Sequence, residues 1–491
     1  MHIRCKYWFL KRNIKSKKLK TMKKLSYFLV AALAFTTTGC SDFLDLTPPS
    51  DANEGTFYKT KKDMESAMVG AYSTLYDIWD PEGLPSFYGE LMSDNAYNTN
   101  TAGNSADYDA LDKHSNLVTT NTLVEEWWET YYKAIFRLNT IISKGANVAG
   151  AEQFVGEAKF MRAFYYFDMV RAWGDVPLII KPVTTAEAYT YARAPKDQVY
   201  AQIIQDLKDA SAVLPAKSAE RFKGAATSDA ANVLLGKVYL TMGNKEEAKT
   251  WLLKEYGKFS LESDYSKLWG ISNKNCKESI FEIQFAETSS SSQPYSQYWA
   301  MFTPLDNRIV TAWGAGENQV TDDLWNAFEA GDPRRDATIA DGYHTSKGEF
   351  VPTRYCVKWK DSEAKVDKLR ELARNNFIVL RYADVLLMLT EATGDAKYLN
   401  EVRHRAGLPG YGEAGYPAQY NNITLALQHE YQVEFGMEFQ RWFVLQRLGT
   451  AAEVMKNCGK HINTPIYLLP VPQKVVDQNP SVIKQNEFYV K

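Results

Sequence analysis

The residues of this chain that could do chemistry do not form a catalytic pattern. The sequence lacks the GxSxG motif of serine hydrolases, the HExxH motif of zinc proteases and a glycine-rich phosphate loop after a strand. Its six histidines share no motif. Asp322, Asp323 and Asp332 could supply the paired carboxylates of a glycosidase, but acids near Pro and Gly usually cap helices and turns. We expect a protein that is not an enzyme and that holds no metal or cofactor.

Two aromatic-rich stretches indicate ligand binding instead. Residues 77–115 and 257–360 lack helical periodicity and place Trp and Tyr among Asn, Asp, Ser and Gly. A sugar ring has an apolar C–H face that lies flat on an aromatic side chain, and its hydroxyls need polar partners. We therefore expect a glycan-binding surface that uses Trp79, Tyr97, Tyr295, Tyr298, Trp299 and Trp313.

The N-terminal segment predicts export and lipid attachment. After the cationic start Met22-Lys23-Lys24, residues 25–35 form an apolar run that is too short to span a bilayer, as in a signal peptide. Gly39-Cys40 then ends the run as in bacterial lipoprotein signals. We expect translation to begin at Met22, and we expect residues 1–39 to be removed and the Cys40 thiol to carry the lipid. The polar residues 40–56, which contain a Pro-Pro break, then form a tether.

The charge of the remaining chain disfavours nucleic-acid binding. Residues 1–39 hold ten of the 57 Lys and Arg and no Asp or Glu, which leaves 47 basic against 59 acidic residues and a formal charge of −12. An acidic surface repels phosphate backbones and anionic lipid headgroups. Membrane association is therefore expected to come from the lipid anchor.

Helical periodicity dominates residues 57–491. Apolar residues recur at three- and four-residue spacing in 64–76, 127–142, 156–173 and 199–214. Residues 227–256 carry Leu235-Gly236-x-x-Tyr239 and Ala248, which is the tetratricopeptide pattern of a close-packed helical hairpin. Residues 381–407 and 127–173 are degenerate helix pairs. The sequence predicts a mainly α fold with a tetratricopeptide-like scaffold, in which 257–360 is the most irregular, loop-rich part and 279–287 alternates like a strand.

Several segments together resemble the SusD/RagB family of outer-membrane nutrient-binding lipoproteins of the Bacteroidetes. They are RAFYYFDMVRAWGDVPL (162–178), GDPRRDATI (331–339), LRYADVLLMLTEA (380–392), LNEVRHRAGLP (399–409) and LLPVPQKVVDQNPSVIKQNEFY (468–489). Residues 427–447 keep Glu430, Glu434, Glu438, Arg441 and Trp442, which we interpret as helix-packing positions. They depart from the family at Tyr431 and Gln432 (usually Arg-Arg), Phe439 (usually Gly) and Val444 (usually Asp).

The resemblance implies an α-helical body with tetratricopeptide-like repeats and an irregular ligand-binding part. It also implies a partner, a TonB-dependent transporter of the SusC type that the lipoprotein covers like a lid. The expected function is capture of oligosaccharide or polysaccharide at the outer membrane and its delivery to that transporter. Two alternatives remain open at this point: a RagB-like lipoprotein that captures peptides, and a glycoside hydrolase on a helical scaffold.

Overall fold

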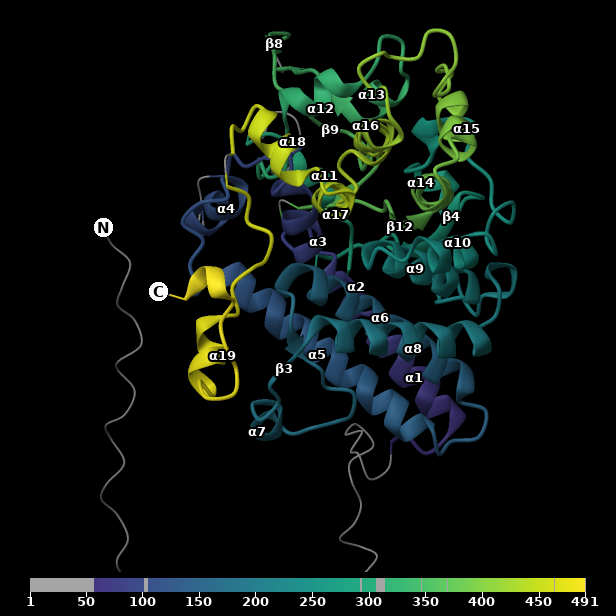
Figure 1. Cartoon of the computed structure of the whole chain (residues 1–491), viewed down its shortest axis with the longest axis vertical. Coiled ribbons are helices and arrows are strands. Elements are labelled where there is room, and N and C mark those ends of the chain that lie inside the picture. The colour runs from purple at the N-terminus through teal and green to yellow at the C-terminus, as the bar shows by residue number, and fades with distance from the viewer. Residues whose placement is uncertain are drawn as a thin grey trace, which may run out of the picture. The chain divides into compact units, whose positions relative to one another are not determined.

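A computed structural model describes residues 57–100, 105–291, 294–305, 314–345, 347–368, 370–462 and 464–490 (Figure 1). The predicted signal peptide, Cys40 and the tether lie outside these residues. No helix in the described part of the chain has the length and apolar character needed to cross a bilayer.

Long helices form the first half of the fold, and each packs against the next along the chain (Figure 1). They are α1 (Lys61–Tyr72), α5 (Thr122–Gly145), α6 (Glu152–Trp173), α8 (Lys196–Val213), α9 (Ser228–Thr241) and α10 (Lys245–Leu252). The array continues from α10 through α14 (Tyr382–Thr393) to α15 (Lys397–Arg405), α16 (Ile423–Phe435) and α17 (Arg441–Leu448). The prediction of a mainly α, repeat-based fold is confirmed.

The α9–α10 hairpin shows why the tetratricopeptide pattern appears in the sequence. The Thr227 side chain caps α9 by accepting a hydrogen bond from Ala230 N. A Cβ atom at Gly236 would lie 2.5 Å from the Leu252 side chain, so the glycine lets α9 and α10 approach closely. Gly243 turns the chain between them with φ of +78°, a conformation that glycine adopts without strain.

Short helices fill the segments between and after the long ones. They are α2 (Thr74–Ile78), α3 (Leu84–Ser86), α4 (Ser105–Asp112), α7 (Thr185–Ala188), α11 (Tyr298–Phe302), α12 (Asp322–Ala327), α13 (Arg334–Thr338), α18 (Ala451–Asn457) and α19 (Gln473–Gln478). A π-helical turn at Phe87–Leu91 follows α3 directly.

The strands are short and pair only in twos within the described residues. β4 (Ser279–Ile283) runs antiparallel to β12 (Phe377–Arg381) with Phe377 opposite Ile283, which confirms the first five residues of the strand predicted at 279–287. The other pairs are β1 (Ala96–Tyr97) with β5 (Gln319–Val320), β2 (Val176–Pro177) with β3 (Arg193–Ala194), β6 (Ile339–Ala340) with β9 (Tyr355–Cys356), β7 (Tyr343–His344) with β8 (Phe350–Val351), and β10 (Lys365–Asp367) with β11 (Arg370–Leu372).

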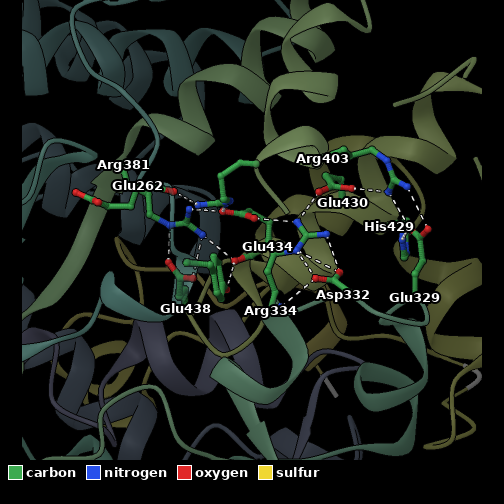
Figure 2. Close-up of polar contacts among 12 residues, drawn as sticks. Glu262, Glu329, Asp332, Arg334, Arg381, Arg403, His429, Glu430, Glu434 and Glu438 are labelled. Carbon is green, nitrogen blue, oxygen red and sulfur yellow. Dashed lines mark hydrogen bonds and ion pairs between the residues drawn. The ribbon is translucent and has the colours of Figure 1, made fainter. Parts of the chain in front are cut away.

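A buried network of ion pairs joins α13, β12, α15 and α16 (Figure 2). Arg334 Nη1 lies 2.9 Å from Glu434 Oε2, and Arg381 Nη1 lies 2.5 Å from Glu434 Oε1. Arg403 Nη1 lies 3.0 Å from Glu430 Oε2. Burial alone would raise the pKa of Glu434, but Arg405, Arg381 and Arg334 together hold it well below its usual range. The interpretation of Glu430 and Glu434 as helix-packing charges is confirmed.

Candidate functional site

The two aromatic-rich stretches predicted from the sequence lie against each other. β1 pairs with β5, so that Tyr97 is opposite Gln319. Beyond this pair, Thr99 N donates to Gly316 O at 2.9 Å, and Asn100 Nδ2 donates to Glu317 Oε1 at 3.1 Å. The contact therefore continues for several residues and fixes the position of both loops.

A cleft of about 420 Å³ opens where these stretches meet, and we call it the loop cleft. Ligand sites of proteins fall in this size range. Its walls come from the end of α2 and the loop after it, from Ser291 and residues 294–298, and from the start of β11. The lining residues that could bind a ligand are Tyr76, Asp80, Ser291, Tyr295, Gln297 and Arg370.

Gln297 connects the polar groups of the loop cleft. Its Nε2 donates to Asp80 Oδ2 at 3.3 Å, and its Oε1 accepts from Tyr295 OH at 3.2 Å and from Arg370 Nη1 at 3.2 Å. Tyr76 OH is held by Gln284 O at 2.8 Å. The arrangement sets an amide, a carboxylate and a guanidinium beside two tyrosine rings, which is a combination suited to a ligand rich in hydroxyl groups.

Asp80 is the carboxylate of this cleft whose pKa its surroundings raise to near neutral. Burial raises the pKa of Asp80 to about 6, and the nearby carboxylates of Glu82, Glu126 and Asp77 act in the same direction. A hydrogen bond of 3.0 Å from Glu82 N to Asp80 Oδ1 opposes this rise. The Asp80 carboxylate is therefore mainly ionised at neutral pH, although it is partly shielded from water.

Two of the six aromatics predicted to bind a ligand belong to the main hydrophobic core. The Trp79 side chain is only 6% exposed, and its ring lies 5.0 Å from that of Phe377 and 5.9 Å from that of Phe164. Tyr298 is fully buried and donates its hydroxyl hydrogen to Trp79 O. Both residues contribute to the wall of the loop cleft, but neither ring has a free face for stacking. The sequence interpretation of these two residues as exposed loop aromatics is corrected accordingly.

The other four candidates are placed differently. Tyr295 lines the loop cleft, although most of its surface is buried. Trp299 is only 5% exposed and lies in a second, small buried cluster with Tyr343 and Tyr355. Tyr97 is half-buried in β1, and Trp313 lies outside the described residues. Ligand binding by these residues stays a prediction.

The polar residues of the loop cleft are not among the six candidates. Gln297 lies between the candidates Tyr295 and Tyr298 in the sequence. This position was the signal that could have identified it as a site residue. Tyr76 ends a predicted helical stripe, and Arg370 lies in a stretch without a pattern. Their approach depends on the contact between distant loops, which no local spacing encodes.

The acids considered as glycosidase candidates have structural partners. Asp332 Oδ2 lies 2.8 Å from Arg334 Nη2 in the buried network. Asp322 pairs with Arg354, and Asp323 accepts a hydrogen bond from Gly459 N. Within the described residues, no group of three or more His, Cys, Asp and Glu side chains has a geometry that could hold a metal ion.

Two family models match most of this scaffold. Residues 42–240 match a SusD-like family described as "Starch-binding associating with outer membrane", and residues 342–466 match the SusD family. The chain belongs to the SusD/RagB family. The second match contains β12, α14, α15, α16 and α17, the elements that carry most of the buried ion-pair network.

Similar proteins support this family membership along the whole chain. SusD-like protein P2 of Formosa agariphila is 27% identical over 95% of this chain and 100% of its own length. A SusD-like protein of Bacteroides ovatus is 25% identical over 87% of this chain and 82% of its own. Among solved structures, a laminarin-binding SusD-like protein matches with a TM-score of 0.74 and 27% identity, over 88% of this chain and 100% of that one. Surface glycan-binding protein A from Bacteroides fluxus matches with a TM-score of 0.71 and 25% identity, over 89% and 100%.

Proposed function

We propose that this SusD/RagB protein is a cell-surface lipoprotein that binds glycans in the loop cleft and delivers them to a SusC-like TonB-dependent transporter. The observation that carries the proposal is the loop cleft itself, in which Gln297 joins Asp80, Tyr295 and Arg370. A laminarin-binding SusD-like protein and a surface glycan-binding protein share this fold, which supports the proposal.

The chemistry of the cleft favours sugar over an apolar ligand. Asp80 and Gln297 supply acceptors for sugar hydroxyls, and Arg370 and the amide of Gln297 supply donors. Tyr76 and Tyr295 offer aromatic surface to the C–H face of a ring. The cleft is open to solvent and leaves part of a bound sugar in water. The affinity of one site is therefore expected to be modest.

The lipid anchor and the transporter partner belong to the same proposal. The anchor rests on the signal-like residues 22–39 and on Cys40. The transporter rests on what the SusD/RagB resemblance implies. Both assign the protein to the outer membrane, the location named in the description of the matched family.

Calorimetric titration of the mature chain against a panel of laminarin, starch, xylan, mannan and peptides tests the proposal. We expect at least one polysaccharide to bind. Gln297→Ala should lower that affinity roughly threefold to tenfold, because loss of the Gln297 amide removes about one or two hydrogen bonds to the ligand. Gln205→Ala, at an exposed position of α8, is the matched control and should bind as the wild type does.

Other results would contradict the proposal in different ways. If no glycan binds and a peptide binds clearly, the RagB-like alternative would be favoured. Unchanged affinity in a folded Gln297→Ala variant would remove the loop cleft as the site. Release of reducing ends from a bound polysaccharide would show that the protein is a hydrolase, contrary to our expectation of binding without catalysis.

A further inference from the structure

A second cavity of about 500 Å³ adjoins the loop cleft, and we call it the α5 cavity. It lies between α2 with its following loop on one side and α5 on the other. Tyr76, Asp77 and Asp80 line both the loop cleft and the α5 cavity, so the two spaces share a wall. A chain of several sugar units that fills the loop cleft can therefore continue over this wall.

Carboxylates dominate the polar lining of the α5 cavity. Asp77, Asp80 and Glu82 come from the α2 side, and Glu126 comes from α5. Asp80 and Glu82 have hydrogen-bond partners in Gln297 and Tyr108. Asp77 and Glu126 are exposed and make no hydrogen bond or ion pair with the described residues. Two carboxylates thus remain available to accept hydrogen bonds from a ligand.

The basic groups do not cancel this charge inside the cavity. Lys133 Nζ is held by Glu129 Oε2 at 3.1 Å. Arg137 is exposed on α5, and burial raises the pKa of Asp77 although Arg137 acts against the rise. Asp80, with its pKa raised to about 6 by burial, is mainly anionic at pH 7.5. The cavity therefore carries a net negative charge at neutral pH.

We propose that the α5 cavity is a further sugar subsite, continuous with the loop cleft, and that its carboxylates restrict it to uncharged sugar units. This inference rests on the proposed glycan binding. Hydroxyl groups of a neutral sugar donate to ionised carboxylates in charge-assisted hydrogen bonds. The carboxylate of a uronate, or a sulfate group, in the same place meets like charge and cannot itself donate a hydrogen bond, so a sugar unit that carries it is rejected.

A variant that fills the α5 cavity tests the subsite. Thr130 lies on α5 and lines the cavity, so Thr130→Tyr occupies its space. Titrations use laminari-, malto- and xylo-oligosaccharides of two and six units. We use the hexamer that the wild-type protein binds, together with its dimer. We expect Thr130→Tyr to lower the affinity for that hexamer at least fivefold and to leave the affinity for the dimer unchanged. Thr250→Tyr, at an exposed position of α10, is the control and should change neither.

A second titration tests the charge selectivity. Wild type should bind the neutral hexamer at least tenfold more tightly than hexagalacturonate, and the double variant Asp77→Asn, Glu126→Gln should narrow that ratio. Equal or tighter binding of hexagalacturonate by wild type overturns the inference but leaves glycan binding intact. An equal effect of Thr130→Tyr on dimer and hexamer overturns it as well. If no oligosaccharide or polysaccharide binds, the proposed function is overturned, and so is this inference.

Discussion

At the scale of single residues, Asp80 links the site to the stability of the fold. Its pKa is raised to about 6 by burial, above the ordinary value of 3.8. The folded state therefore binds its proton more tightly than the unfolded state does. Its contribution to the free energy of unfolding is fully present below about pH 4 and is lost as the pH rises through 6.

This pH dependence of stability predicts how Asp80→Asn should behave. The variant carries no charge at any pH, so it should be more stable than wild type by roughly 1–2 kcal/mol at pH 7.5, and the difference should vanish near pH 4. Urea denaturation at both pH values measures it. Asp264→Asn is the control, because hydrogen bonds from Ser266 lower the pKa of Asp264 and no gain is expected there. A gain for Asp80→Asn that is equal at both pH values would contradict the argument.

Phe439 shows what residue-level reading of the sequence could and could not predict. The sequence marks this position as a departure from the glycine usual in SusD/RagB proteins. The reason for that glycine is visible only in the structure, where Phe439 has φ of +62° and Met437 has φ of +67°. Buried Glu90 accepts hydrogen bonds from Met437 N at 2.8 Å and from Phe439 N at 2.9 Å. The carboxylate that holds this turn comes from a distant segment, which local sequence patterns do not connect to it.

At the scale of elements, the buried ion pairs hold the end of β12 to α16. Arg381 is 1% exposed and contacts Glu278, Glu434 and Glu438 at 2.8, 2.5 and 2.9 Å. Taking charges out of water costs several kcal/mol for each ion, and here the cost is offset by multiple close partners. Removal of one partner leaves the others buried and unpaired.

We therefore expect Arg381→Ala to lower the free energy of unfolding by about 3–5 kcal/mol. Lys397→Ala, at the first residue of α15, removes an exposed ion pair with Asp395 and is the comparison; it should cost less than about 1 kcal/mol. Chemical denaturation of both variants measures the contrast. Similar values for the two would show that the buried network adds little to the stability of this fold.

The elements also explain which aromatics were misplaced. The long helices were predictable because several turns of apolar periodicity define a buried face. α2 and α11 have five residues each, which is too short for such a pattern. Trp79 at the end of α2 and Tyr298 at the start of α11 therefore looked like loop residues, although both pack into the core.

At the scale of the whole molecule, the motifs that reveal the SusD/RagB family and the residues that line the cleft are different sets. Arg381, Arg403 and Glu434 of the motifs are each buried among charged partners, so that replacing one would leave buried charges unpaired. The loop cleft instead depends on half-buried and exposed residues such as Gln297 and Arg370, whose replacement would leave no buried charge unpaired. The sequence could therefore predict the scaffold and the regions of the site, but not the contacts within it.

The proposed glycan site lies where the two loop stretches meet, in the loop cleft. Hydrogen–deuterium exchange of the mature chain, with and without a saturating oligosaccharide that binds in the titrations, tests this location most directly. We expect slower exchange in residues 74–82 and 294–298 and unchanged exchange in α14 to α17. Protection confined to α14–α17, or no change in the two loop segments while calorimetry shows binding, would contradict it.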